Sequence, residues 1–80
     1  MKLLKTADRI YSMEDVRTVS NNTYTTNHVS RGSKYEVVHH HIHIGYTDGH
    51  NITIECGEDG AGKVMSDKMF NDIFEILSKD

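Results

Sequence analysis

The 80-residue chain has no tryptophan, no proline and one cysteine, Cys56. One cysteine excludes a disulfide within the chain, so the sequence predicts a protein of the reducing cytoplasm. No segment approaches the roughly 20 apolar residues of a transmembrane helix, and the apolar stretch after Met1 is too short for the core of a signal peptide. We therefore expect no membrane partner.

Positive charge is also scarce. Nine Lys and Arg residues are scattered singly against twelve Asp and Glu, which gives a net charge of −3. Binding to nucleic-acid phosphates requires clustered basic side chains, so a nucleic-acid partner is not expected. Weak binding of single strands, by stacking of bases on Tyr35 and the histidines, is a second alternative function.

A chain of this length predicts one small domain spanning residues 1–80. Such a domain buries about 60% of the surface of its unfolded chain and has little stability to spare. A second copy would supply further buried surface, so we expect a homodimer.

The strongest strand signal runs from Lys34 to Gly57, where Val, Ile, Tyr and His dominate. Side chains on a strand alternate between its two faces, which sorts the first half of this segment into two sets. One set is Val38, His40, Ile42, Ile44 and Tyr46, and the other is Tyr35, Val37, His39, His41 and His43.

A turn of three residues, 47–49, brings the apolar sets of two strands onto one face, with Gly49 in the left-handed conformation. A two-residue turn would place them on opposite faces. The three-residue turn predicts these pairs: Tyr46 with His50, Ile44 with Ile52, Ile42 with Ile54, His40 with Cys56, His43 with Thr53 and His41 with Glu55.

The N-terminal half shows weaker strand signals. Residues 2–6 predict a short edge strand, and residues 10–19 predict strand interrupted by a turn or bulge at 12–15. The polar segment 20–33 predicts a hairpin that turns at Asn21-Asn22 and again at Arg31-Gly32, with a long mobile loop as the alternative.

The C-terminal segment predicts an amphipathic helix that follows a turn at 57–62 and has Ser66 as its N-cap. Its apolar face comprises Met69, Phe70, Ile73, Phe74, Ile76 and Leu77, and we expect both Phe residues to pack on the sheet. The predicted fold class is α+β, an antiparallel four- to five-stranded sheet (a meander) with one C-terminal amphipathic helix packed on one face. The opposite face, which carries Tyr35, Val37, His39, His41 and His43, is left open.

The histidines on the open face suggest a metal site. Two histidines at i and i+2 on a strand point the same way, with Cα atoms about 6.6 Å apart, so both can reach one ion. The candidate ligands for Zn, Ni or Cu are His39, His41, His43 and Glu55, with His28 as a further ligand if its segment lies alongside. Since His39 and His43 are about 13 Å apart, one ion would use one adjacent pair.

We favour a simpler role for these histidines, as part of a polar sheet surface or a dimer interface. The carboxylate of Glu55 beside His41 would favour the imidazolium form, and histidine ordinarily titrates near pH 6.5. Association through this face would then change between pH 5 and 8.

Two other patterns suggest chemistry that the chain does not support. Residues 57–63 fit the spacing of a phosphate-binding loop, but Val64 stands where a hydroxyl must meet magnesium, and two acidic residues inside the loop would repel phosphate. Cys56 opposite His40 could form a nucleophile and base, yet both are expected to face the helix as core residues.

Parts of the sequence resemble known groups of proteins. The segment His41-Ile42-His43 followed by Asp48 resembles the first metal motif of cupins, but the chain lacks proline, a second histidine motif and room for a double-sheet barrel. Residues 3–5, 10–16, 52–54 and 70–73 resemble short uncharacterised bacterial open reading frames, often from mobile elements. This resemblance implies no activity, and we expect a non-enzymatic interaction or regulatory module without a resident cofactor.

Overall fold

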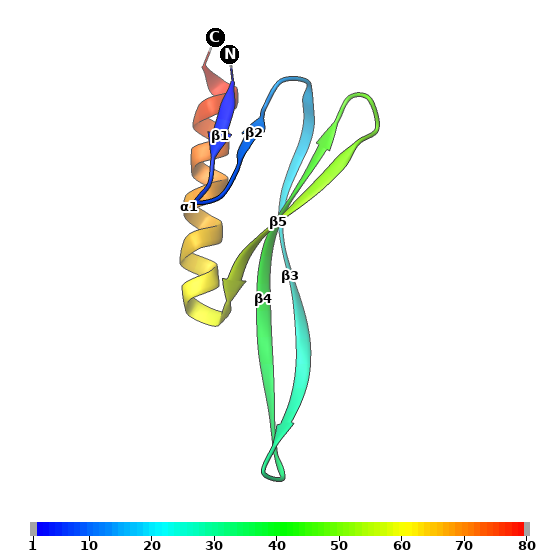
Figure 1. The fold of residues 1–80 in the computed structure, drawn as a ribbon, viewed down its shortest axis with the longest axis vertical. Coiled ribbons are helices and arrows are strands. Elements are labelled where there is room, and N and C mark those ends of the chain that lie inside the picture. Colours follow the sequence, from blue (N-terminus) through cyan, green and yellow to red (C-terminus); the bar gives the residue numbers. More distant parts are fainter. Residues whose placement is uncertain (1, 80) are drawn as a thin grey trace.

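The computed structural model describes residues 2–79, which form five strands and one helix (Figure 1). The elements are β1 (Leu3–Lys5), β2 (Ile10–Ser12), β3 (Val16–Ser30), β4 (Ser33–Tyr46), β5 (Asn51–Glu58) and α1 (Asp59–Ser78). The predicted α+β class, with antiparallel strands and a C-terminal helix on the sheet, is confirmed. The strands divide into two sheets, β1-β2 and β3-β4-β5.

The break between β2 and β3 lies where the sequence predicts it. Met13 leaves the strand, its backbone N–H donates to the carbonyl of Lys2 at 2.8 Å, and its side chain is buried. Asp15 then adopts a positive φ of 60°, which turns the chain into β3. The interruption therefore also supplies a core residue.

The hairpin of β3 and β4 is the longest feature of the fold. Its turn is the two residues Arg31 and Gly32, with φ of 52° and 78°, as the tight turns of twisted hairpins require. The predicted turn at Asn21-Asn22 is wrong, and so is the mobile loop, because both asparagines pair with β4 inside a continuous strand. β4 offers a partner along the whole length of β3, and the side-chain amide of Asn21 is held by α1.

The register of β4 against β5 agrees with the prediction at four positions. Ile44 pairs with Ile52, Ile42 with Ile54, His43 with Thr53 and His41 with Glu55. Gly49 has the expected positive φ, 92°, and the N–H of Tyr46 donates to the carbonyl of His50 at 2.9 Å.

The sixth predicted pair of this register, His40 with Cys56, is wrong. A bulge shifts the ladder by one residue between His40 and His41, so His40 lies opposite Gly57. Gly57 has a φ of 123°, a conformation that glycine adopts readily and that accommodates the extra residue.

α1 begins two turns earlier than the sequence predicts. Asp59 is its first residue, so the predicted turn at 57–62 and the N-cap at Ser66 are wrong. Ser66 is instead buried within the helix, where its hydroxyl donates to Oδ1 of Asn21 at 2.6 Å. The helix can extend back to Asp59 because Gly62 lets its backbone lie directly against Gly57.

The core lies between α1 and the sheet. It contains three of the four isoleucines predicted on one face of β4 and β5, one helix residue and two residues of the N-terminal segment: Ile42, Ile44, Ile54, Ile73, Leu4 and Met13. The fourth isoleucine, Ile52, is partly buried against this core. The prediction that both Phe residues pack there is wrong, because Phe70 and Phe74 are 36% and 68% exposed. The buried side of the helix is a line of three residues, Gly62, Ser66 and Ile73. The rings of Phe70 and Phe74 lie beside this line and so remain at the edge of the contact with the sheet.

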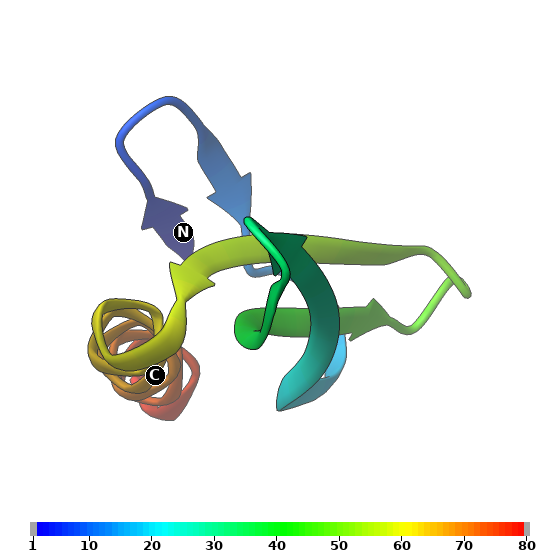
Figure 2. The same cartoon turned by 90° about the horizontal axis from the view of Figure 1, so that it is seen from below.

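The β3–β4 hairpin extends well past the first turn of α1 as a two-stranded ribbon (Figure 1). In the view from below, the helix lies to one side of the sheet and the ribbon twists away from it (Figure 2). The radius of gyration is 14.9 Å, against about 12 Å for a compact domain of this length, and the longest axis spans 53 Å. Within residues 2–79, no helix combines the length and apolar character needed to cross a membrane.

Candidate functional site

The face of the β3–β4 ribbon opposite the helix carries a row of imidazole and aromatic rings. The five β4 residues predicted for this face share it, and the pairing of the two strands adds alternate residues of β3. We call this surface the imidazole face; it comprises Ser20, Asn22, Tyr24, Thr26 and His28 of β3 and Tyr35, Val37, His39, His41 and His43 of β4.

Ring stacking orders this face. Tyr24 and His39 are opposite each other in the ladder and stack with centroids 4.6 Å apart and planes 10° apart. His41 packs against the same tyrosine at 5.7 Å, tilted by 50°. Nearer the turn, His28 and Tyr35 stack at 5.3 Å. Cross-strand ring pairs of this kind fix side chains in place, so the face is preorganised.

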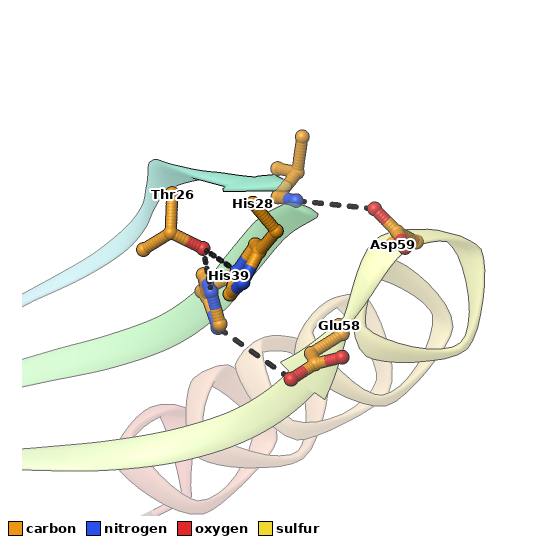
Figure 3. A network of polar contacts seen from close by, with 6 residues as sticks. Thr26, His28, His39, Glu58 and Asp59 are labelled. Atoms are coloured by element: carbon orange, nitrogen blue, oxygen red, sulfur yellow. Dashed lines mark hydrogen bonds and ion pairs between the residues drawn. The ribbon is translucent and has the colours of Figure 1, made fainter. Parts of the chain in front are cut away.

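Thr26 joins two of the imidazoles. Its hydroxyl oxygen lies 2.8 Å from Nε2 of His28 and 2.8 Å from Nε2 of His39 (Figure 3). A hydroxyl has one proton to donate and two lone pairs that accept, so it can bond both rings at once. The two Nε2 atoms are therefore held on one oxygen.

The junction of β5 and α1 brings two carboxylates beside this network (Figure 3). Oε1 of Glu58 is 4.0 Å from Nδ1 of His39. Asp59 accepts a hydrogen bond of 3.1 Å from the backbone N–H of Val38, at the point where β5 stops pairing with β4. The carboxylate nearest to a histidine of the ribbon is thus Glu58, which the sequence analysis did not select.

His41 and His43 are placed as predicted in the ladder but form fewer polar contacts. His43 Nδ1 is 3.3 Å from Oγ1 of Thr53. Glu55 lies opposite His41, yet Nδ1 of His41 is buried and has no hydrogen-bond partner within the described part of the chain. A buried polar nitrogen without a partner costs about 1–3 kcal/mol, so His41 is the least satisfied of the three β4 histidines on this face.

The predicted metal ligands therefore share a face but do not converge. Among residues 2–79 there is no group of three or more His, Cys, Asp or Glu side chains that could hold one ion. The pair that does converge is His28 and His39, on Thr26. His28 is the ligand that the sequence analysis made conditional on strand pairing, and that pairing is present.

Cys56 and His40 do not form a nucleophile and base pair. The bulge separates them in the ladder, and the thiol donates to the carbonyl of Ile54 at 3.6 Å. Burial raises the pKa of the Cys56 thiol, and the neighbouring Glu55 carboxylate adds to this shift. The thiol lines an open hollow of about 510 Å³ between the β1–β2 turn, β5 and α1, together with Met65 and Met69.

The turn between β4 and β5 contains a separate contact of an acid and an imidazole. Asp48 accepts bonds from the backbone N–H of His50, at 2.9 Å, and from its imidazole, at 2.7 Å. These bonds lower the pKa of the Asp48 carboxyl, the backbone bond most strongly. This contact confirms Asp48 as a turn residue and separates it from the histidines of the imidazole face.

Comparison of the chain with protein-family models, with curated protein sequences and with solved structures finds no match. The site must therefore be interpreted from its own geometry. The sequence analysis missed Tyr24 and Thr26, although a two-residue turn at Arg31-Gly32 would have set Tyr24 opposite His39 and revealed both.

Proposed function

We propose that the protein is a non-enzymatic interaction module of the cytoplasm that binds a protein partner through the imidazole face. The observation that supports this proposal most strongly is the row of stacked rings on a projecting ribbon, which no other element within residues 2–79 covers. The Cys56 thiol, the one nucleophile considered from the sequence, bonds the carbonyl of Ile54 and is not opposite His40.

The composition of the face suits protein recognition. Tyr24 and Tyr35 are 45% and 50% exposed, and tyrosine is enriched at the centres of protein interfaces because it offers a large rigid area with a polar tip. Stacking on His39 and His28 holds both rings before binding, which reduces the entropy lost on association.

Site-specific crosslinking in the native host tests this proposal. A photoreactive phenylalanine analogue replaces Tyr35, and we expect an adduct of defined mass that the additional substitution Tyr24→Asp removes. The matched control carries the same analogue at Asn71, an exposed position on α1. The proposal fails if position 35 yields no adduct, or if positions 35 and 71 yield the same adducts.

Binding of a transition-metal ion is a second candidate, favoured by the convergence of two imidazole nitrogens on Thr26. Neutral imidazole is a good ligand for Zn, Ni and Cu, and displacement of the hydroxyl would leave two nitrogen donors close together. Two protein ligands form half of a tetrahedral site, so we expect weak binding.

Calorimetric titration of tag-free protein with zinc, nickel and copper separates the two possible ligand sets. Because two imidazole nitrogens converge on Thr26, we expect the double variant His28→Ala, His39→Ala to lose metal binding and the double variant His41→Ala, His43→Ala to keep it. The reverse result would restore the ligand set predicted from the sequence, and an unchanged titration of both variants would exclude the strand histidines as ligands.

A further inference from the structure

The outer edge of β3 is a free strand edge fifteen residues long. Its backbone pairs with β4 on one side and, within residues 2–79, with no strand on the other. Beyond the first turn of α1, the ribbon consists of β3 and β4 alone, with no further strand beside them and no helix against them among the described residues (Figure 1). An isolated two-stranded hairpin is marginal in water, so this part of the ribbon is a surface that a further strand would stabilise.

The direction of the backbone groups follows from the contacts of Val38. Its N–H donates to Asp59 and so points away from β3. Its partner in the ladder, Thr25, therefore belongs to a non-hydrogen-bonded pair and directs its own N–H and C=O outward. By the alternation of an antiparallel ladder, the odd-numbered residues 21–29 of β3 present free donors and acceptors along this edge.

The edge lacks the features that normally prevent pairing with another chain. Natural edge strands carry lysines, prolines, other charges or bulges. From Thr18 to Ser30 there is no Pro, Gly, Lys, Arg, Asp or Glu, and the ladder with β4 is regular from Thr18 onward. Two copies of this strand can therefore meet without juxtaposing like charges.

Each end of the strand also carries an exposed apolar feature. Val29, near the turn, is 69% exposed. At the other end, a groove of about 300 Å³ lies between the start of β3 and α1, lined by Val16, Val19, Phe70 and Phe74 among others. Val19 and Val29 are ten residues apart on one strand and therefore lie on the same face of the sheet.

We propose, building on the interaction module above, that the partner at this edge is a second copy of the chain. The two β3 strands pair antiparallel about a two-fold axis at Thr25, which creates a continuous six-stranded sheet, β5-β4-β3-β3-β4-β5. One chain supplies both the exposed valine and the apolar groove, and an antiparallel arrangement brings the two together. A strand of unrelated sequence would need to match both features independently.

The position of the axis determines the contacts. Thr25 lies opposite its counterpart, Val29 of each copy lies opposite Asn21 of the other, and Tyr24 lies opposite Thr26. Because Asn21 is bonded to Ser66 of α1, one turn before Phe70, Val29 of one copy reaches the groove of the other. The axis is perpendicular to the sheet, so the two imidazole faces lie on the same side of the dimer and adjoin.

Sedimentation equilibrium of the wild type and of backbone and side-chain variants tests the pairing. Thr25→Pro removes an outward N–H without removing a bond to β4, so we expect a monomer with an unchanged circular dichroism spectrum.

The contact of Val29 with the groove is tested by charged substitutions. Val29→Lys and Phe70→Glu should each raise the dimer dissociation constant at least tenfold. The double variant should recover to within about threefold, because each new lysine meets a glutamate of the partner. Val64→Glu, on an exposed part of α1 outside the groove, is the matched control and should leave the constant unchanged.

The inference is overturned if the wild type is monomeric at millimolar concentration, or if a folded Thr25→Pro variant dimerises as well as the wild type. It is also overturned if the dimer dissociation constant of the Val29→Lys, Phe70→Glu double variant is as high as those of the single variants. This comparison does not depend on whether the proline variant folds. If the protein is monomeric but still gives an adduct at Tyr35, the β3 dimer is wrong and the interaction module is supported. If the protein dimerises through β3 but gives no adduct at Tyr35, the β3 dimer is supported and binding of a partner through the imidazole face is wrong.

Discussion

At the scale of single residues, Gly62 determines how closely α1 approaches the end of β5. A Cβ at this position would lie 2.4 Å from the backbone carbonyl of Gly57 and 3.1 Å from the ring of His40. The obstacle is backbone, which cannot move aside without opening the bulge. Gly60, two residues earlier on the same helix, has no atom within 4 Å of the corresponding point.

Gly62→Ala should therefore lower the free energy of unfolding by about 1–3 kcal/mol, the usual cost of inserting an atom into a packed site. Gly60→Ala is the control and should raise it by up to about 1 kcal/mol, because alanine favours the helix. Urea denaturation of both variants measures the difference. Equal effects of the two substitutions would contradict the close approach of α1 to Gly57.

Cys56 gives a second prediction at this scale. Burial raises the pKa of the Cys56 thiol. In the folded protein the thiol therefore keeps its proton at pH values at which the unfolded chain has lost it. Stability from this group is complete below about pH 8.5, the ordinary pKa of a cysteine, and decreases as the pH rises through the folded value. The midpoint of the alkylation rate against pH should lie higher in the native protein than in 6 M urea. A native midpoint below the unfolded one would indicate an activated cysteine and revive its role as a nucleophile.

At the scale of elements, α1 shows which part of the fold the sequence could predict. The period of its apolar residues correctly predicted a C-terminal helix on the isoleucine face of β4 and β5. The position of its buried line depended on Gly62 and Ser66, two small residues that an apolar pattern does not register. Their contacts with Gly57 and Asn21 are tertiary, so they could not be read from local sequence.

The buried line of α1 predicts a contrast between two neighbouring residues of the helix. Ile73 is fully buried, and its substitution by alanine should lower the free energy of unfolding by about 2–4 kcal/mol. Phe74→Ala should cost less than about 1 kcal/mol in the monomer, although phenylalanine is the larger side chain. Thermal and urea denaturation at low protein concentration provide the comparison. A larger loss at Phe74 would place the phenylalanine in the core, as the sequence alone suggests.

The sequence likewise predicted some features of the strands and not others. The three-residue turn at 47–49 followed from turn chemistry and alternation. The four pairs that this turn predicts between residues 41–44 and β5 are correct. The bulge at Cys56 and the unbroken course of β3 did not follow, because each depends on a partner strand. Asn21-Asn22 resembles a turn in isolation, yet it pairs fully when β4 lies beside it.

At the scale of the whole molecule, the shape itself argues for association. A small core of isoleucines supports a ribbon that projects beyond it, carrying ordered rings on one face and a free edge on one side. The sequence predicted that the β4 rings share one face, and the short length of the chain led us to expect a homodimer. It could not identify the edge of β3, because that edge depends on the ribbon being continuous.

The proposed dimer depends most directly on the outward amides of β3, and hydrogen exchange followed by NMR measures them one by one. By the alternation of the ladder, the N–H groups of Thr23, Thr25 and Asn27 point away from β4, whereas those of Tyr24 and Thr26 point toward it. Pairing with a second copy predicts that all five amides exchange slowly at high protein concentration and that the three odd-numbered ones become fast on dilution. Fast exchange of the odd-numbered amides at every concentration would contradict the pairing.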